Sequence, residues 1–316
     1  MSIRLNRRSP MTSPRIIFFG TRCFFADHVL DQLVNGGHEI VARIVPGYRG
    51  APVPCQMLQG PGRSTGKTLP LVNNGGSNGT SKRTSSIPTL MVHNHRSPET
   101  AGMLTSFEAD LAIVCCYPMR LPRRLNATTR LGGLNVHPSL LPAYRGPEPL
   151  FWMYRDGALS GGVTIHKVAA ELDAGDVIAQ RAISINIGKP GDELWRESAE
   201  LAAAMLLDVL PDHEHCLRSA TPQPSHNASY QSWPTRDDLL IDPGECDAWR
   251  LFHFCRGALP LGYSPLLELA SGIHQIVSTS GYVDEGSQVA PESDPDDERI
   301  VCRSGEIYVR LSRGES

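Results

Sequence analysis

Apolar residues follow strand-like and helix-like patterns in turn along the first part of the chain. Residues 15 to 20 (RIIFFG) form a short apolar run that predicts a buried strand. Residues 24 to 33 then place apolar side chains at helical spacing, and residues 39 to 45 form a second strand-like run. A strand, a helix and a strand in this order predict a βαβ unit, which is typical of the α/β class of folds.

Further strand-like runs extend the predicted sheet. Residues 111 to 116 and 133 to 136 are continuous apolar runs rather than alternating ones, as expected of parallel strands buried on both faces. Residues 162 to 168 and 177 to 185 add two more runs on either side of a short turn. We therefore expect a Rossmann-like, mostly parallel sheet.

Helix signals and composition suggest where this sheet domain ends. Residues 192 to 210 have a helical period that stops before Pro211. We place the sheet domain at residues 11 to 210, after an N-terminal extension of residues 1 to 10. A stretch rich in Pro, Ser and His from 211 to 232 predicts a linker to the rest of the chain.

The last part of the chain predicts a second, smaller domain at residues 233 to 316. One helical segment, residues 246 to 256, precedes several short strand-like runs. Short strands in this number predict a β-barrel-like fold of the OB type. The runs are residues 266 to 270, 274 to 279, 300 to 303 and 307 to 311.

The segment from 46 to 96 differs in composition from its surroundings. Of the 27 residues from 60 to 86, twenty are Gly, Ser, Thr, Asn or Pro, a composition that buries too little apolar area to order itself. We expect a flexible loop. It is also basic, because residues 40 to 98 contain seven Lys or Arg and no Asp or Glu.

Composition and charge narrow the function classes. The 316 residues are 41% hydrophobic and 20% charged, which is typical of a soluble globular protein. Residues 1 to 210 carry 22 Lys and Arg against 16 Asp and Glu, whereas residues 211 to 316 carry 8 against 17. The net charges of +6 and −9 mean that the first part could meet an anion and the second would repel one.

Several classes are not expected. No apolar run approaches the roughly 18 residues of a membrane span, and the N-terminus lacks a secretory apolar core, so we expect a cytoplasmic protein. Eight cysteines without a CxxC pair do not predict a disulfide framework or a zinc site. The stretches HNH (His93 to His95) and HEHC (His213 to Cys216) lack a metal-ligand spacing, and we expect solvated loops there and no metal.

The stretch LNVHPSLLPAYRG, from Leu134 to Gly146, carries the candidate chemistry. Asn135 and His137 share a face at the carboxyl end of a predicted strand, where ligands bind in open α/β sheets. Asp173 lies in the later turn LDAG. An amide, an imidazole and a carboxylate together can stabilise an oxyanion and move protons. A histidine at a strand end more often has a structural role, so these three residues alone do not establish catalysis.

A wider set of residues resembles the formyltransferase family that uses 10-formyltetrahydrofolate. The order and spacing match from about residue 15 to residue 210. Residues 233 to 316 are similar, more weakly, to the C-terminal barrel of methionyl-tRNA formyltransferase, a member of that family. The matching residues include FFGT at 18 to 21, Asn135, His137, SLLP at 139 to 142, Arg145-Gly146 and LDAGD at 172 to 176.

The resemblance implies transfer of a formyl group to a primary amine. In such a reaction Asn135 and His137 would donate hydrogen bonds to the oxyanion, His137 best as an imidazolium. Asp173 would raise the pKa of His137 and, through a water, accept the proton that the amine loses.

The resemblance also implies where the substrates bind. The folate would lie near Cys116, Tyr117, Met119 and Leu121, although Cys115-Cys116 and Pro118-Met119 stand where the family commonly has small residues. Further candidates for the folate site are Ser139, Leu140, Leu141, Pro142 and Asp176. Candidates for binding the phosphates of an acceptor are Arg49, Arg63, Lys67, Lys82, Arg83 and Arg145.

Three alternatives for the acceptor and the activity stay open. The methionyl amine of initiator methionyl-tRNA agrees with the two-domain layout and the basic loop. A small amine, such as an amino sugar nucleotide or a hydroxyornithine-type side chain, agrees better with the acidic second domain. A folate-binding protein without turnover is the third alternative, and the oligomeric state is open.

Overall fold

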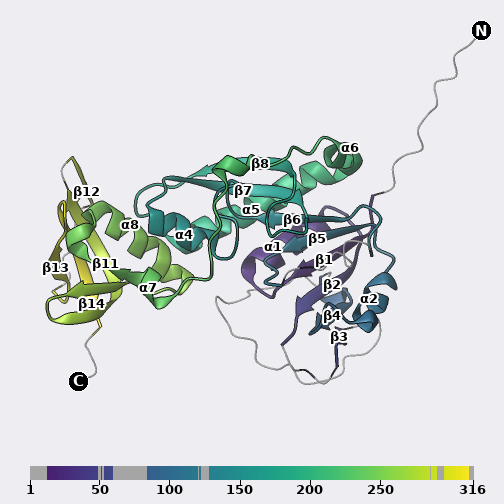
Figure 1. Cartoon of the computed structure of the whole chain (residues 1–316), viewed down its shortest axis with the longest axis horizontal. Coiled ribbons are helices and arrows are strands. Elements are labelled where there is room, and N and C mark those ends of the chain that lie inside the picture. The colour runs from purple at the N-terminus through teal and green to yellow at the C-terminus, as the bar shows by residue number, and fades with distance from the viewer. Residues whose placement is uncertain are drawn as a thin grey trace, which may run out of the picture.

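An eight-stranded mixed sheet forms the first part of the structure (Figure 1). The computed structural model describes residues 13–48, 51, 53–59, 84–119, 121, 128–284, 286–289 and 295–312. The strand order is β3-β4-β2-β1-β5-β6-β7-β8, with β4, β2, β1, β5 and β6 parallel and the other three antiparallel to their neighbours. The strands are β1 (Ile16–Gly20), β2 (Ile40–Pro46), β3 (Cys55–Gln59), β4 (Thr89–Val92), β5 (Leu111–Cys115), β6 (Gly133–His137), β7 (Ser160–Lys167) and β8 (Val177–Ser184).

Helices cover both faces of this sheet, which is why its central strands are apolar throughout. Helices α1 (Phe24–Asn35) and α5 (Gly191–Val209) pack together on the face to which Ile16 and Phe18 of β1 point. Helix α2 (Pro98–Thr105) lies on the opposite face with Phe19. Alternate side chains of one strand therefore enter two separate cores, as the continuous apolar runs predict.

A second sheet forms most of the C-terminal part. Its strand order is β13-β14-β11-β10-β9, with β12 paired to β11. In the residues that the structure describes, β9 and β13 do not pair with each other, so a β domain is present and an OB-type barrel stays a prediction. The elements are α7 (Arg236–Leu239), β9 (Leu240–Ile241), α8 (Ala248–Ala258), β10 (Leu266–Leu269), β11 (Gly272–Asp284), β12 (Ser287–Val289), β13 (Glu298–Val301) and β14 (Glu306–Leu311).

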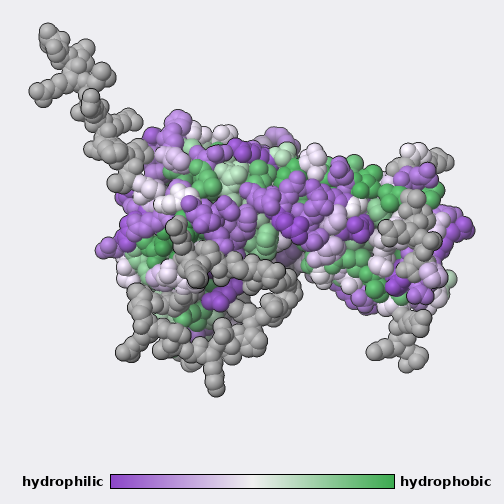
Figure 2. All heavy atoms as spheres, turned by 180° about the vertical axis from the view of Figure 1, so that it is seen from behind, coloured by the Kyte–Doolittle hydropathy of each residue, from purple (hydrophilic) through white to green (hydrophobic). Residues whose placement is uncertain are grey.

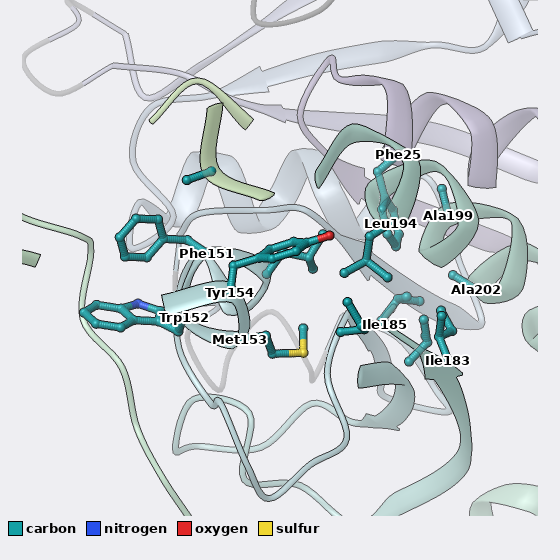
Figure 3. Packing of buried hydrophobic residues seen from close by; sticks show 14 of the residues in the cluster. Phe25, Phe151, Trp152, Met153, Tyr154, Ile183, Ile185, Leu194, Ala199 and Ala202 are labelled. Carbon is teal, nitrogen blue, oxygen red and sulfur yellow. The ribbon is translucent and has the colours of Figure 1, made fainter. Parts of the chain in front are cut away.

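Helix α8 joins the two parts through an apolar interface. It packs on α4 (Pro149–Asp156), where the rings of Phe151 and Phe254 lie 5.6 Å apart. A Cβ atom at Gly257 would lie 2.1 Å from the ring of Tyr154, so only glycine allows this approach. Figure 3 shows Phe151 to Tyr154 of α4 beside Leu194 of α5, and one continuous apolar cluster contains these residues together with Phe254 of α8.

Two segments are more ordered than the sequence predicts. The segment from 46 to 96, expected to be a flexible loop, contributes β3, β4 and a 3-10 turn (Thr84–Ser86), whereas residues 60 to 83, on which that expectation mainly rests, lie outside the described residues. The expected linker from 211 to 232 contains α6 (His213–Arg218) and a second 3-10 turn (Ser225–Asn227). The N-terminal extension of residues 1 to 10 lies outside the described residues.

The surface in Figure 2 shows hydrophobic residues scattered among hydrophilic ones. None of the described helices is both long and apolar enough to cross a bilayer.

Candidate active site

Strand β6 brings the two motif residues next to a third polar side chain. In the antiparallel register of β6 and β7, Asn135 pairs with His166. Directly opposed residues of two strands point to the same face, so His166 joins Asn135 and His137 on one side of the sheet. Both histidine side chains are buried, and that of His166 is almost completely shielded from water.

Asp173 completes this group from the turn that follows β7. Its backbone is in the left-handed region, with φ of 53°. Gly175 allows the turn to close, because a Cβ atom there would lie 1.8 Å from the carbonyl oxygen of Lys167. We refer to Asn135, His137, His166 and Asp173 as the polar cluster.

Both amide hydrogens of Asn135 are engaged inside the polar cluster. Its Nδ2 donates to Oδ1 of Asp173 at 3.1 Å and lies 3.0 Å from Nε2 of His166. Nδ1 of His166 lies 2.9 Å from the carbonyl oxygen of Lys167 and must carry a hydrogen, so Nε2 is the acceptor in a neutral ring. The amide can reach an oxyanion only by releasing one of these partners.

His137 is held through one ring nitrogen and open at the other. Its Nε2 donates to the carbonyl oxygen of Tyr144 at 2.7 Å, whereas Nδ1 lies 3.8 Å from Oδ2 of Asp173, too far for a hydrogen bond. Burial lowers the pKa of His137, and the charge of Asp173 offsets this only in part. Asp173 raises the pKa of His137 as expected, but desolvation has the larger effect, so the net shift is downward and favours the neutral ring.

Asp173 is a buried but firmly ionised carboxylate. Burial by itself would raise its pKa, but the neighbouring His137 and His166 and a hydrogen bond from the N–H of Gly146 lower it to about 2. The Gly146 N–H donates to Oδ2 at 2.9 Å. The carboxylate can therefore stabilise a positive charge that forms on His137.

Residues 221 to 232, the strap, hold the turn that carries Asp173. Oε1 of Gln223 accepts hydrogen bonds from Nε and Nη2 of Arg145 at 3.0 and 2.6 Å. Nε2 of Gln223 donates to the carbonyl oxygens of Asp173 and Gly175 at 2.8 and 2.7 Å. A single amide thus ties the left-handed turn to the motif arginine.

The strap also pairs with the motif through its backbone. The Tyr144 N–H donates to Oγ of Ser229 at 2.8 Å, and the Arg145 N–H to the Ser229 carbonyl at 3.0 Å. The Gln231 N–H donates back to the Arg145 carbonyl at 2.8 Å. A Cβ atom at Gly146 would lie 2.2 Å from the Gln231 carbonyl oxygen, so the motif glycine permits this close pairing.

A cavity of about 1190 Å³ opens over the polar cluster. This volume exceeds that of a site for one drug-sized ligand and leaves room for two substrates. One wall comes from the carboxyl end of β5, where the predicted folate residues Cys116, Tyr117, Met119 and Leu121 lie. Glu148, Tyr230, Trp233, Leu259 and Leu261 also line the cavity.

Other predicted site residues do not line this cavity. Ser139, Leu140, Leu141 and Pro142 build a turn beneath it, in which Oγ of Ser139 donates to the Ala143 carbonyl oxygen at 2.8 Å. Asp176 pairs with Lys167 at 3.2 Å instead. Arg145 is occupied by Gln223 rather than free for a phosphate. The candidates Arg49, Arg63, Lys67, Lys82 and Arg83 lie outside the described residues.

Three of the histidines that were expected in solvated loops, His93, His95 and His213, are buried as well, whereas His215 is exposed. His93 accepts a hydrogen bond from the Tyr48 N–H at 3.0 Å, and His95 bonds the Tyr117 hydroxyl at 2.9 Å. Burial lowers the pKa of His95 to about 4. The His93 and His95 rings therefore have a structural role next to the β5 wall.

The mostly parallel sheet thus presents the polar cluster at the carboxyl end of β6, where open α/β sheets bind their ligands. The formyl transferase family model matches residues 15 to 210, and the chain belongs to this family.

Individual relatives share parts of the chain. The methionyl-tRNA formyltransferase of Listeria monocytogenes is 34% identical over 187 residues, which are 58% of this chain and 59% of that protein. HypX from Aquifex aeolicus, in complex with tetrahydrofolic acid, has a TM-score of 0.61 at 17% identity over 94% of this chain and 44% of that one. The N-formyltransferase from Helicobacter canadensis, with folinic acid and dTDP-3-aminofucose, has a TM-score of 0.59 at 14% identity. The match covers 95% of this chain and 100% of that one.

Proposed function

We propose that the protein transfers a formyl group from 10-formyltetrahydrofolate to a primary amine. The observation that carries this proposal is the polar cluster at the floor of a cavity with room for a donor and an acceptor. Family membership supports the reaction class. The solved relatives from Aquifex aeolicus and Helicobacter canadensis, which hold tetrahydrofolic acid and folinic acid, support a folate as the formyl donor.

The β5 wall fits the flat ring system of a folate. It is largely apolar, with Val114 and Leu121 beside Tyr117 and Met119. Backbone groups at the end of a parallel strand remain available for polar ring atoms. The folate supplies the formyl group, and the residues of the chain supply positioning and proton transfer.

His137 moves the proton in this scheme. A neutral His137 keeps a lone pair on Nδ1, because Nε2–H is bound to the Tyr144 carbonyl. Nδ1 takes the proton that the amine loses as its nitrogen bonds to the formyl carbon. The imidazolium formed is stabilised by Asp173 and returns the proton to N10 of the folate as that nitrogen leaves. The products are the formamide and tetrahydrofolate.

Asn135 has two roles in the same scheme. At rest its amide holds Asp173 and His166 in place. As charge develops on the formyl oxygen, the amide releases one partner and donates to the oxyanion. Removing one donor of this kind typically costs about 10²- to 10³-fold in rate.

For the acceptor we propose the methionyl amine of methionyl-tRNA. The relative from Listeria monocytogenes is named for that acceptor. The basic segment from 40 to 98 has the charge that a nucleic acid requires.

A small amine is the second candidate. The net charge of −9 over residues 211 to 316 disfavours a polyanion close to the C-terminal part. The structural relative with dTDP-3-aminofucose matches nearly the whole chain. A folate-binding protein without turnover is the weakest alternative, because the polar cluster is complete.

One assay separates these candidates. The protein is incubated with formyl-labelled 10-formyltetrahydrofolate and either methionyl-tRNA or a panel of amino sugar nucleotides and other amines. Label on the tRNA, with an apparent affinity that falls steeply with salt, supports the first candidate. Label only on a small amine, with a flat salt response, supports the second. No labelled product from any amine contradicts the proposed function.

A further inference from the structure

Glu148 is a charged residue of the cavity to which the proposed reaction gives no role. It is the residue before α4, and its backbone is in the left-handed region with φ of 54°. Gly146, two residues earlier, donates its N–H to Asp173, so the same short segment connects Glu148 to the polar cluster. Glu148 lines the cavity together with Asn135, His137 and Asp173.

Protein contacts hold this carboxylate but do not neutralise it. The Tyr263 hydroxyl donates a hydrogen bond to it, and the Tyr263 ring packs against Phe151 at 4.7 Å between centroids. Burial raises the pKa of Glu148, and the Tyr263 hydrogen bond offsets this only in part. Within the described part of the chain, Glu148 forms no ion pair with Lys, Arg or His.

The other acids that line the cavity either lie beside a basic residue or are exposed to water. Asp173 lies beside two histidines, and Asp192 lies 3.7 Å from Arg196. Glu171 is exposed to water. A carboxylate that is withdrawn from water without a cation costs free energy, which a cationic ligand would recover.

The chemistry of the two substrates indicates which of them supplies that cation. Glu148 lies close enough to Cys116 on the β5 wall for its charge to act on that thiol, and Leu259 to Gly262 line the same cavity. The carboxylate is therefore available to a ligand in the cavity that the predicted folate residues also line. A primary amine is cationic near neutral pH, whereas the formyl group is neutral.

We propose that Glu148 binds the ammonium group of the acceptor and so selects amines over hydroxyl compounds of the same shape. This inference rests on the proposed function for the identity of the acceptor as an amine. It concerns binding; the ammonium loses one proton to water before its nitrogen attacks the formyl carbon, and His137 takes the second as the bond forms. Charge-assisted hydrogen bonds of this kind are the stronger ones in proteins.

The test compares matched ligands on the wild type and on Glu148→Gln, which keeps the size of the side chain and an acceptor for Tyr263. One ligand pair is methionyl-tRNA and its α-hydroxy analogue; the other is dTDP-3-aminofucose and dTDP-fucose. We expect the wild type to bind the amine of one pair at least about tenfold more tightly, and Glu148→Gln to lose that preference. Folate affinity should stay within about twofold in both proteins.

The control is Glu193→Gln, which removes an exposed charge from the first turn of α5. This variant should keep the amine preference. A wild type without preference in both pairs, or a Glu148→Gln protein that keeps it, overturns the inference. Because binding is measured without turnover, a preference for the amine with no formyl product would contradict the proposed function and leave this inference standing.

Discussion

The polar cluster and the strap meet at the same cavity but work in different ways. The cluster consists of side chains at the end of β6 and in the turn of Asp173, and each offers a group that can move a proton or bear charge. The strap acts through backbone pairing with residues 142 to 146 and through the amide of Gln223. The comparison teaches that the chemistry and the geometry of this site come from separate parts of the chain.

The largest effect is expected from removing the charge of the polar cluster. In Asp173→Asn the imidazolium on His137 loses its stabilising carboxylate, so kcat for formyl transfer should fall about 10²- to 10⁴-fold. The matched control is Asp208→Asn, an exposed acid that pairs with Arg181 of β8 and does not line the cavity. Steady-state assays of both variants check this, and a full rate for Asp173→Asn would contradict the assigned role.

The pH dependence of formyl transfer should be set by the polar cluster and not by the strap. Burial lowers the pKa of His137, so the neutral ring persists below the ordinary histidine pKa of 6.5 and is lost only as the pH falls further. With the concentration of unprotonated amine held constant at each pH, the acidic limb of kcat/KM should therefore lie below pH 6.5 and fall about tenfold per pH unit. Variants of the strap should not change the pH at which this acidic limb occurs. A rate that falls as the pH rises through 6.5 would show instead that His137 acts as the imidazolium.

The strap should affect rate through position. Gln223→Ala frees the left-handed turn of Asp173, and a small misplacement of a catalytic group can cost about 10²-fold. We expect kcat to fall about tenfold to 10²-fold while the KM for folate changes little. Gln223→Glu keeps the acceptor for Arg145 but loses both N–H donors to the turn, so its kcat should fall as far as that of Gln223→Ala.

Gln231→Ala is the control within the strap, since Gln231 pairs with Arg145 through its backbone. Its kcat should stay close to that of the wild type. Equal rates for Gln223→Ala and Gln231→Ala would mean that the strap does not position Asp173.

The smallest effect is expected at Ser229. Ser229→Ala removes the acceptor of the Tyr144 N–H but leaves the backbone pairing intact. The free energy of unfolding should fall by about 1 kcal/mol, with little change in kcat. Denaturant unfolding measures this change. A loss of activity as large as that of Gln223→Ala would place the catalytic effect of the strap in this hydrogen bond instead.

The difference between the polar cluster and the strap explains which site residues could be predicted from the sequence. The β6 motif predicts Asn135 and His137 because a polar pair at the end of an apolar strand is visible in one short stretch. His166 and Gln223 were missed, since their roles depend on a cross-strand register and on a contact across 50 residues. The pKa direction of His137 was also missed, because burial is a property of the whole fold.

Composition misled in the segments with few apolar residues. The strap is rich in Pro, Ser and His and resembles a linker, yet its hydrogen bonds go to the motif loop. His95 was expected in a solvated loop and is buried against Tyr117. In both cases the order comes from hydrogen bonds to distant residues, which hydrophobic periodicity does not report.

The most direct test of the account is a single-turnover measurement of formyl transfer by the wild type and by His137→Ala, with folate affinity measured by titration of the same samples. The account predicts folate affinities within about twofold and a rate at least about 10²-fold lower in the variant. A His137→Ala protein that binds folate and transfers the formyl group at the wild-type rate would contradict the central claim that this histidine moves the proton.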